Sequence, residues 1–183
     1  MKNKIIWHRF LSDQKGASVI EAAFILPVLV TIMFGFIDIG SAISVRQKVI
    51  NSSQIAGDLI ARERTLTTPE ATQAMEAALL AIDPFDRQEF GIAIIGIRFD
   101  DTETAGEPDP QPEEIWRETL GTVDVPASAI SNAEGLGVFN EGIIIVVSQY
   151  RYVPPFTNTL FPEYVFQEIS YFRGRRNSFI PRV

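Results

Sequence analysis

Residues 16–37 read GASVIEAAFILPVLVTIMFGFI, and this stretch decides how the chain is organised. Residues 17–37 would form a helix about 31 Å long, which matches the roughly 30 Å thickness of a bilayer's hydrocarbon core. Residues 28–36 are apolar all round such a helix and not along one stripe. The stretch therefore predicts a membrane span, and we favour that reading over the core helix of a soluble protein.

The charges on either side of the span predict its orientation. The first 16 residues hold four basic side chains and one acid, a net charge of +3, whereas only Arg46 and Lys48 closely follow the span. Because basic flanks stay in the cytoplasm, we expect the N-terminus inside the cell and the remaining chain exported. That remainder carries a net charge of −10, which does not suit a phosphate backbone, so we expect no nucleic-acid partner.

Glu21 is the side chain of this helix that most needs an explanation. A carboxylate costs roughly 2.5–3.5 kcal/mol at the centre of a membrane helix and less near its end. Cleavage between Gly16 and Ala17 would create a cationic α-amino group. A neighbouring subunit could present that amine to Glu21 in a low dielectric and so fix the axial register of the two helices. Two alternatives stay open: Glu21 reaches the interface without a partner, or the span is a secretory signal cut at the small residues 40–42.

Other residues of the span have two readings each. Pro27 removes the helix hydrogen bond to Ala23 and predicts a kink. Gly35 and Gly40 would allow close approach of a second helix. Either feature can equally be a tolerated irregularity of a membrane helix. Asp38 is expected at the outer interface, in contact with water and without a structural role.

Beyond the span, hydrophobic periodicity predicts two helical segments. The first helix is expected to continue, with a narrow apolar face that packs on the chain's own sheet in preference to a partner helix; its members are Ala42, Val45, Val49, Ser52, Ala56 and Leu59. A second helix is predicted to begin with Thr68 as its cap, Pro69 in its first turn and Glu70 as an early acid. The pair Asp83-Pro84 is predicted to end it.

The remaining chain reads as strands and loops. Strands are predicted at residues 92–99, 114–119, 143–153 and 165–173, with a possible bulge at Gly96 and one helical turn near residues 127–132. The fold class is therefore α+β, an antiparallel sheet of about four strands packed against helices. The predicted organisation is a basic leader (1–16), a transmembrane helix (17–45) and an exported α+β domain (46–183).

The order of these motifs resembles a known family. The leader, Gly16 and Glu21 resemble type IV prepilins, which carry a glycine at the cut and a glutamate at the fifth mature position. The whole order resembles the TadE/TadG-like pseudopilins of the tight-adherence (Flp) pilus system. The matching parts are GASVIEAAFILP (16–27), AGDLI (56–60), IW (115–116), YRYVP (150–154) and PR (181–182). The chain departs from the family at Ala22, where phenylalanine is more common.

This resemblance implies a non-enzymatic minor pilin or pseudopilin of an Flp pilus or of a related type II/IV secretion machine, in the service of cell adhesion. A prepilin peptidase would remove the leader. The other partners would be further pilins or pseudopilins, inner-membrane pilus assembly proteins and the lipid bilayer. The implied location is the bacterial inner membrane, crossed once, with the C-terminal domain periplasmic or otherwise extracytoplasmic.

The residues argue against catalysis. The chain has no cysteine, its one histidine is His8 in the leader, and its one lysine beyond the leader is Lys48. Serine–histidine, cysteine–histidine, serine–lysine and histidine–zinc sites are therefore unavailable after cleavage. No spacing singles out a pair of carboxylates for acid–base work, so we expect neither an enzyme nor a cofactor.

Two charged segments leave an alternative function open. The acidic, proline-rich residues 100–112 could hold a hard cation, which would make the chain a membrane-anchored ligand- or cation-binding module. Their spacing lacks the EF-hand order and favours a solvated connection, so no metal ligand is predicted. Arg173, Arg175 and Arg176 could contact anionic headgroups or an acidic partner, but a solvated strand end is favoured.

Overall fold

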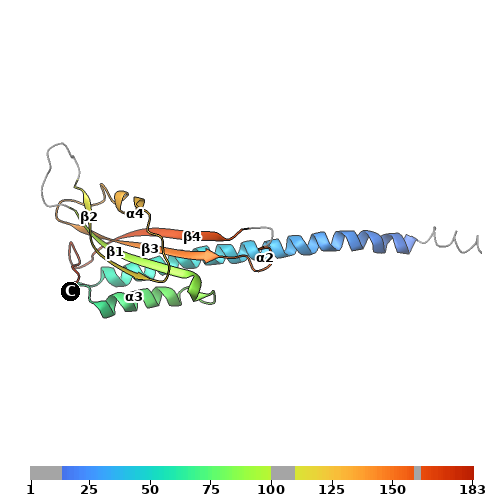
Figure 1. Ribbon diagram of the computed structural model, residues 1–183, viewed down its shortest axis with the longest axis horizontal. Helices are drawn as coiled ribbons and strands as arrows, with labels where there is room; N and C mark the ends of the chain where they lie inside the picture. The colour runs from blue at the N-terminus through green and yellow to red at the C-terminus, as the bar shows by residue number, and fades with distance from the viewer. Residues whose placement is uncertain (1–13, 100–109, 159–161) are drawn as a thin grey trace, which may run out of the picture.

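A single long helix dominates the computed structural model, which describes residues 14–99, 110–158 and 162–183. This helix, α2, is Gln14–Ala61, and its 48 residues extend for about 72 Å. Figure 1 shows its N-terminal half projecting alone from the molecule, while its C-terminal half lies along the sheet. The prediction that the apolar helix continues beyond the span is confirmed.

The sheet has four strands in the order β2-β1-β3-β4, and every neighbouring pair is antiparallel. The strands are β1 (Phe90–Phe99), β2 (Pro112–Leu120), β3 (Gly142–Tyr152) and β4 (Tyr164–Arg173). All four were predicted, with boundaries that differ by at most two residues. The central strands β1 and β3 are buried over nearly their whole length, because layers cover both faces of the sheet. The α+β fold class is therefore confirmed.

Each face of the sheet has its own hydrophobic cluster. On one face, α2 and α3 (Thr68–Leu80) cover alternate residues of the central strands, such as Ile92, Ile94 and Val146. On the other face, the short helix α4 (Ser128–Ser131) and its flanking loop cover Ile95 and Val147. This division follows from the two-residue period of a strand, which sends successive side chains to opposite faces.

The buried face of α2 differs from its prediction at one end. Val45, Val49 and Ala56 are buried as expected, but Ile60 is buried at 1% exposure in place of Leu59, which is 38% exposed. A strict three-four spacing assumes 3.5 residues per turn, whereas a straight helix has 3.6 and drifts by about 20° per heptad. Two heptads of drift turn Leu59 by about 40° away from a face centred on Val49 and Ala56, and Ile60, which follows Ala56 by four residues, lies on that face instead.

The start of α3 is shifted by one residue from the prediction. Thr67, and not Thr68, is the N-cap. Its backbone N–H donates to the Glu70 carboxylate at 2.8 Å, and its hydroxyl donates to the same oxygen at 2.7 Å. These bonds lower the pKa of Glu70. The capping box requires its glutamate three residues after the cap, which places the cap at Thr67.

The predicted irregularity at Gly96 is confirmed. The pairing of β1 with β2 shifts register between Gly96 and Ile97. The indole of Trp116 lies over Gly96, where a Cβ atom would overlap it. The glycine thus allows the one tryptophan of the sheet to pack against the neighbouring strand.

Candidate functional site: the projecting half of helix α2

Within the described part of the chain, the projecting half of α2 is apolar and almost wholly exposed. Among the described residues, one helix is long and apolar enough to cross a membrane, with a window of mean hydropathy 2.3 near the N-terminus. That window is 0% buried, which argues against the core helix of a soluble protein, since such a helix would be covered. The helix fits a single-pass membrane anchor.

The residues of the predicted cut, Gly16 and Ala17, lie in α2, near the first helical residue that the structure describes. Whether cleavage occurs there stays a prediction.

Glu21 lies one helical turn beyond Ala17 and is exposed. Positions four apart share one side of a helix and are separated by about 6 Å along its axis. Within the described part of the chain, no hydrogen bond or ion pair reaches the Glu21 carboxylate. Ala17 and Glu21 therefore share one side of the helix by their spacing, and a group from another molecule can reach the exposed Glu21 carboxylate.

Pro27 does not end the helix. α2 is continuous through it, and the Thr31 hydroxyl donates to the Pro27 carbonyl at 2.9 Å. The predicted kink stays a prediction. Gly35 and Gly40 have no atom within 4 Å of an added Cβ, so both positions are open to a second helix.

Asp38 contradicts its prediction. It is only 4% exposed and does not lie free in water at the interface. Its carboxylate accepts the backbone N–H of Phe156 at 3.3 Å, the N–H of Thr157 at 2.8 Å and the Thr157 hydroxyl at 2.5 Å. Charge-assisted bonds of this kind are stronger than neutral ones. Asp38 thus fixes the loop after β3 to the end of the projecting helix.

Two aromatic contacts complete this junction. The Tyr152 hydroxyl donates to the Asp38 carbonyl at 2.8 Å, and burial, helped by the Asp38 carboxylate, raises the pKa of Tyr152. The rings of Phe34 and Phe156 stack with centroids 4.8 Å apart and planes 3° from parallel. A secretory cut at residues 40–42 would remove Phe34 and Asp38 and so break every one of these contacts.

Sequence reasoning missed the junction because its partners are far apart in the chain. Asp38 and Thr157 are separated by 119 residues, and no local period relates them. The available signal was weak: an acid directly after the apolar segment, and the YRYVP motif near a second hydrophobic stretch.

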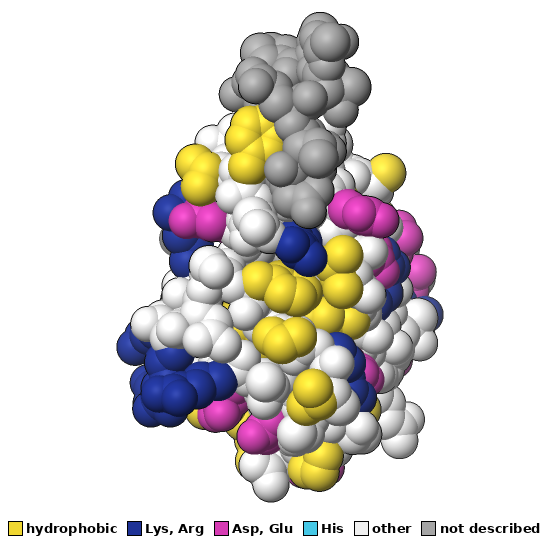
Figure 2. All heavy atoms as spheres, turned by 90° about the vertical axis from the view of Figure 1, so that its left-hand side faces the viewer, with side chains coloured by type: hydrophobic (Ala, Val, Ile, Leu, Met, Phe, Trp, Pro, Cys, Tyr) yellow, Lys and Arg dark blue, Asp and Glu magenta, His cyan; other side chains and the backbone are white. Residues whose placement is uncertain are grey.

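Basic side chains gather at the end of the molecule opposite the projecting helix, which faces the viewer in Figure 2. The arginines considered from the sequence, Arg173, Arg175 and Arg176, belong to this end. The backbone N–H of Arg175 donates to the carbonyl of Ala61, the last residue of α2, and the Arg175 guanidinium pairs with Asp58. Arg173 lies 3.9 Å from Glu141. Ala61 is about 36 Å along the helix from residue 37. These arginines are exposed and far from the apolar stretch 17–37, which agrees with the favoured interpretation of a solvated strand end and not with a headgroup contact.

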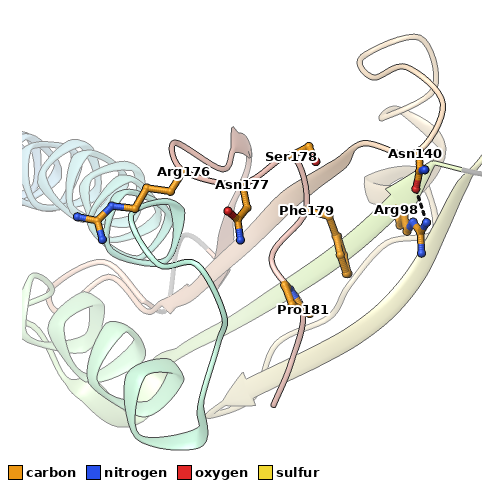
Figure 3. A pocket seen from close by; sticks show the side chains of 7 residues that line it. All are labelled: Arg98, Asn140, Arg176, Asn177, Ser178, Phe179 and Pro181. Atoms are coloured by element: carbon orange, nitrogen blue, oxygen red, sulfur yellow. Dashed lines mark hydrogen bonds between the residues drawn. The ribbon is translucent and has the colours of Figure 1, made fainter.

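A hollow of about 600 Å³ opens at this same end. Figure 3 shows that Arg98 and Asn140 bond to each other on one side of it, that Phe179 stands between, and that Arg176 lies on the far side. The described residues contain no group of three side chains able to hold a metal ion. Most of the acidic segment considered for a cation, residues 100–109, lies outside the described residues.

Comparison with known proteins bears on the anchor. Residues 16–58 match the model of a family described as TadE-like protein. The match covers the projecting half of α2 and most of the half that packs on the sheet. The matched segment is under a quarter of the chain. No curated protein and no solved structure matches. The predicted resemblance to the TadE-like family is thus confirmed over residues 16–58, and the match indicates a component associated with a tight-adherence pilus system.

Proposed function

We propose that the chain is a non-enzymatic minor pilin or pseudopilin of a tight-adherence Flp pilus or a related secretion machine. One observation carries this proposal: the TadE-like helix projects from the sheet domain with an apolar surface that the described residues leave exposed. An anchor needs only hydrophobicity, and a charged side chain near its start would weaken it. In a helix that assembles with neighbouring helices, the Glu21 carboxylate would have a partner.

The proposed event is cleavage between Gly16 and Ala17 by a prepilin peptidase on the cytoplasmic side of the inner membrane. The new α-amine of Ala17 and the carboxylate of Glu21 lie on one side of the helix, one turn apart. In a packed assembly, each amine can pair with the Glu21 of an adjacent helix, and the low dielectric strengthens the attraction. Gly35 and Gly40 leave the backbone near the helix surface, where a neighbouring pilin or pseudopilin can approach.

The sheet domain would then be the exported part that meets other assembly proteins. Its function in this proposal is binding and not catalysis, because the residues after Gly16 include neither histidine nor cysteine. The domain is also rigidly related to the anchor, since α2 is one uninterrupted helix from Gln14 to Ala61.

Mass spectrometry of the chain purified from membranes tests the proposal. We expect a mature N-terminus at Ala17 when the peptidase is present, and the full leader when it is absent. Gly16→Leu should block the cut, because a bulky side chain replaces the glycine at the cleavage point. Gly35→Leu is the matched control, since it makes the same change further along the same helix.

Glu21→Gln separates processing from assembly. It retains the shape of the side chain but removes the charge, so we expect it to weaken co-purification and crosslinking with other pilins. Asp58→Gln, at the far end of α2, should leave co-purification and crosslinking unchanged. An uncleaved wild-type chain in the presence of the peptidase would contradict the proposal, as would a Glu21→Gln chain that assembles normally.

A further inference from the structure

Four exposed apolar side chains, from both faces of the sheet, lie in the segments at the end of the sheet where the domain meets the projecting half of α2. We call Val153, Phe156, Tyr164 and Val165 the membrane-side collar; their exposed fractions are 46, 52, 61 and 45%. They come from the loop after β3 and from the start of β4. Exposed apolar side chains that lie close together mark a surface that binds a protein, a membrane or a ligand.

The position of Phe156 fixes the depth of the collar relative to the end of the membrane span. Its ring stacks on Phe34, which belongs to the predicted span and lies three residues, or about 5 Å, inside its end at residue 37. A helix that lies in a membrane interface buries its apolar face by about 5–10 Å. Phe156 is therefore at the depth at which interfacial side chains meet acyl chains.

Tyr164 lies at the level of the adjoining headgroups. It pairs with Tyr152 in the β3–β4 register, and the Tyr152 hydroxyl bonds to the carbonyl of Asp38, the first residue after the predicted span. Tyrosine is enriched at this level of a membrane because its ring is apolar and its hydroxyl is polar. The level is set rigidly, since Asp38 also holds the N–H groups of Phe156 and Thr157.

We propose that the collar inserts into the interface of the leaflet on the sheet-domain side, as a second membrane contact beside the span. The occupant is lipid, because Phe156 directly touches the span, so the acyl chains that surround Phe34 also reach Phe156. The nearby charges do not oppose this, since Arg151 pairs with Glu89 at 2.7 Å and lies 3.6 Å from Glu163. The collar fixes the tilt of α2 and holds the sheet against the membrane before the protein leaves for any assembly.

The absence of cysteine from the chain makes the test direct. Val153→Cys and Val165→Cys, each in the full chain, are labelled with an environment-sensitive fluorophore and reconstituted into phosphatidylcholine vesicles. Val138→Cys is the matched control: it is a valine of 59% exposure, and it precedes β3 at the end remote from the collar. Ile32→Cys, inside the predicted span, is the positive control. Circular dichroism verifies that each variant is folded.

The collar labels should be quenched severalfold more than the Val138 label by phosphatidylcholine that carries a spin label near its headgroup. Aqueous iodide should give the opposite order. The proposal is overturned if both collar labels behave like Val138 while Ile32 is quenched. It is also overturned if protection from iodide appears only at high protein-to-lipid ratio, because a second copy would then cover the collar. An unquenched Ile32 label would overturn the membrane anchor, on which the proposal rests.

Discussion

The carboxylate of Asp38 on α2 accepts both the backbone N–H and the hydroxyl of Thr157, at 2.8 and 2.5 Å. This buried contact joins the end of the projecting helix to the loop after β3. The helix and the sheet meet mainly through apolar packing, with a further buried bond from the Ser148 hydroxyl to the Val49 carbonyl at 3.0 Å. Asp38 is the buried carboxylate at the boundary, and it fixes where the anchor stops and the domain begins.

Asp38→Ala should destabilise this junction. The change leaves the donors of Thr157 buried without an acceptor, which costs about 1–3 kcal/mol. Asp38→Asn should cost less, because one acceptor oxygen remains. Hydrogen exchange at the Thr157 amide and protease sensitivity of the 153–158 segment, both in detergent-solubilised full chain, measure the effect. Asp58→Ala, which breaks an exposed ion pair at the far end of α2, should leave that segment unchanged. Equal sensitivity in both variants would contradict the assigned role of Asp38.

Gly57→Ala should destabilise the packing of β4 on α2. A Cβ atom at Gly57 would overlap the ring of Phe172, and added volume in a packed core costs roughly 1–3 kcal/mol. Gly40→Ala is the matched control on the same helix, since nothing lies within 4 Å of its Cβ. That control should be neutral or stabilising, because alanine is the better helix former. Denaturant midpoints compare the two, and adding Phe172→Leu should restore part of the loss at Gly57.

Trp116→Phe should loosen the C-terminal segment. The indole N–H donates to the buried carbonyl of Ile180 at 2.9 Å, and an acceptor left unpaired costs about 1–3 kcal/mol. The neighbouring bonds, Leu66 N–H to the Pro181 carbonyl and Val183 N–H to the Leu66 carbonyl, should then exchange faster. Hydrogen exchange at Leu66 and Val183 measures this. Trp7→Phe, in the predicted leader, is the control and should leave both amides protected.

Glu89→Gln should lower stability at neutral pH but not in acid. The hydrogen bonds from Arg151 lower the pKa of Glu89, so the folded state holds this carboxylate ionised at a lower pH than the unfolded chain does. The stabilisation is therefore present above the unfolded pKa of about 4.3 and is lost as the pH falls through the folded pKa. Thermal midpoints from pH 7 down to about pH 3 should converge for wild type and Glu89→Gln. Glu76→Gln, for which the described residues offer no ion pair, should track the wild type at every pH.

The local structure of this protein can be predicted from short segments of its sequence. The apolar run before residue 37, the β-branched strands and the glycine beneath Trp116 each carry their signal within a few residues, because helix and strand periods are local properties. The TadE-like motif is local for the same reason, and residues 16–58 alone match the family. Two predictions were off by one residue: the cap of α3 is Thr67 and not Thr68, and Ile60 is buried in place of Leu59. Both errors arose because the exact cap position and the rotation of a helix depend on backbone geometry that a hydrophobic pattern does not record.

The structural roles of the charged side chains, in contrast, could be read only from the tertiary structure. Asp38 follows an apolar segment and reads as exposed, yet the fold brings Thr157 to it across 119 residues and buries both. For the arginines near residue 175 the sequence favours a solvated strand end but leaves a lipid contact open, and it is the course of β4 alongside α2 that carries them to the end remote from the span. A charge has no period of its own, so its role depends on which distant segment packs against it, and that is set by the pairing of β3 and β4 beside the long helix.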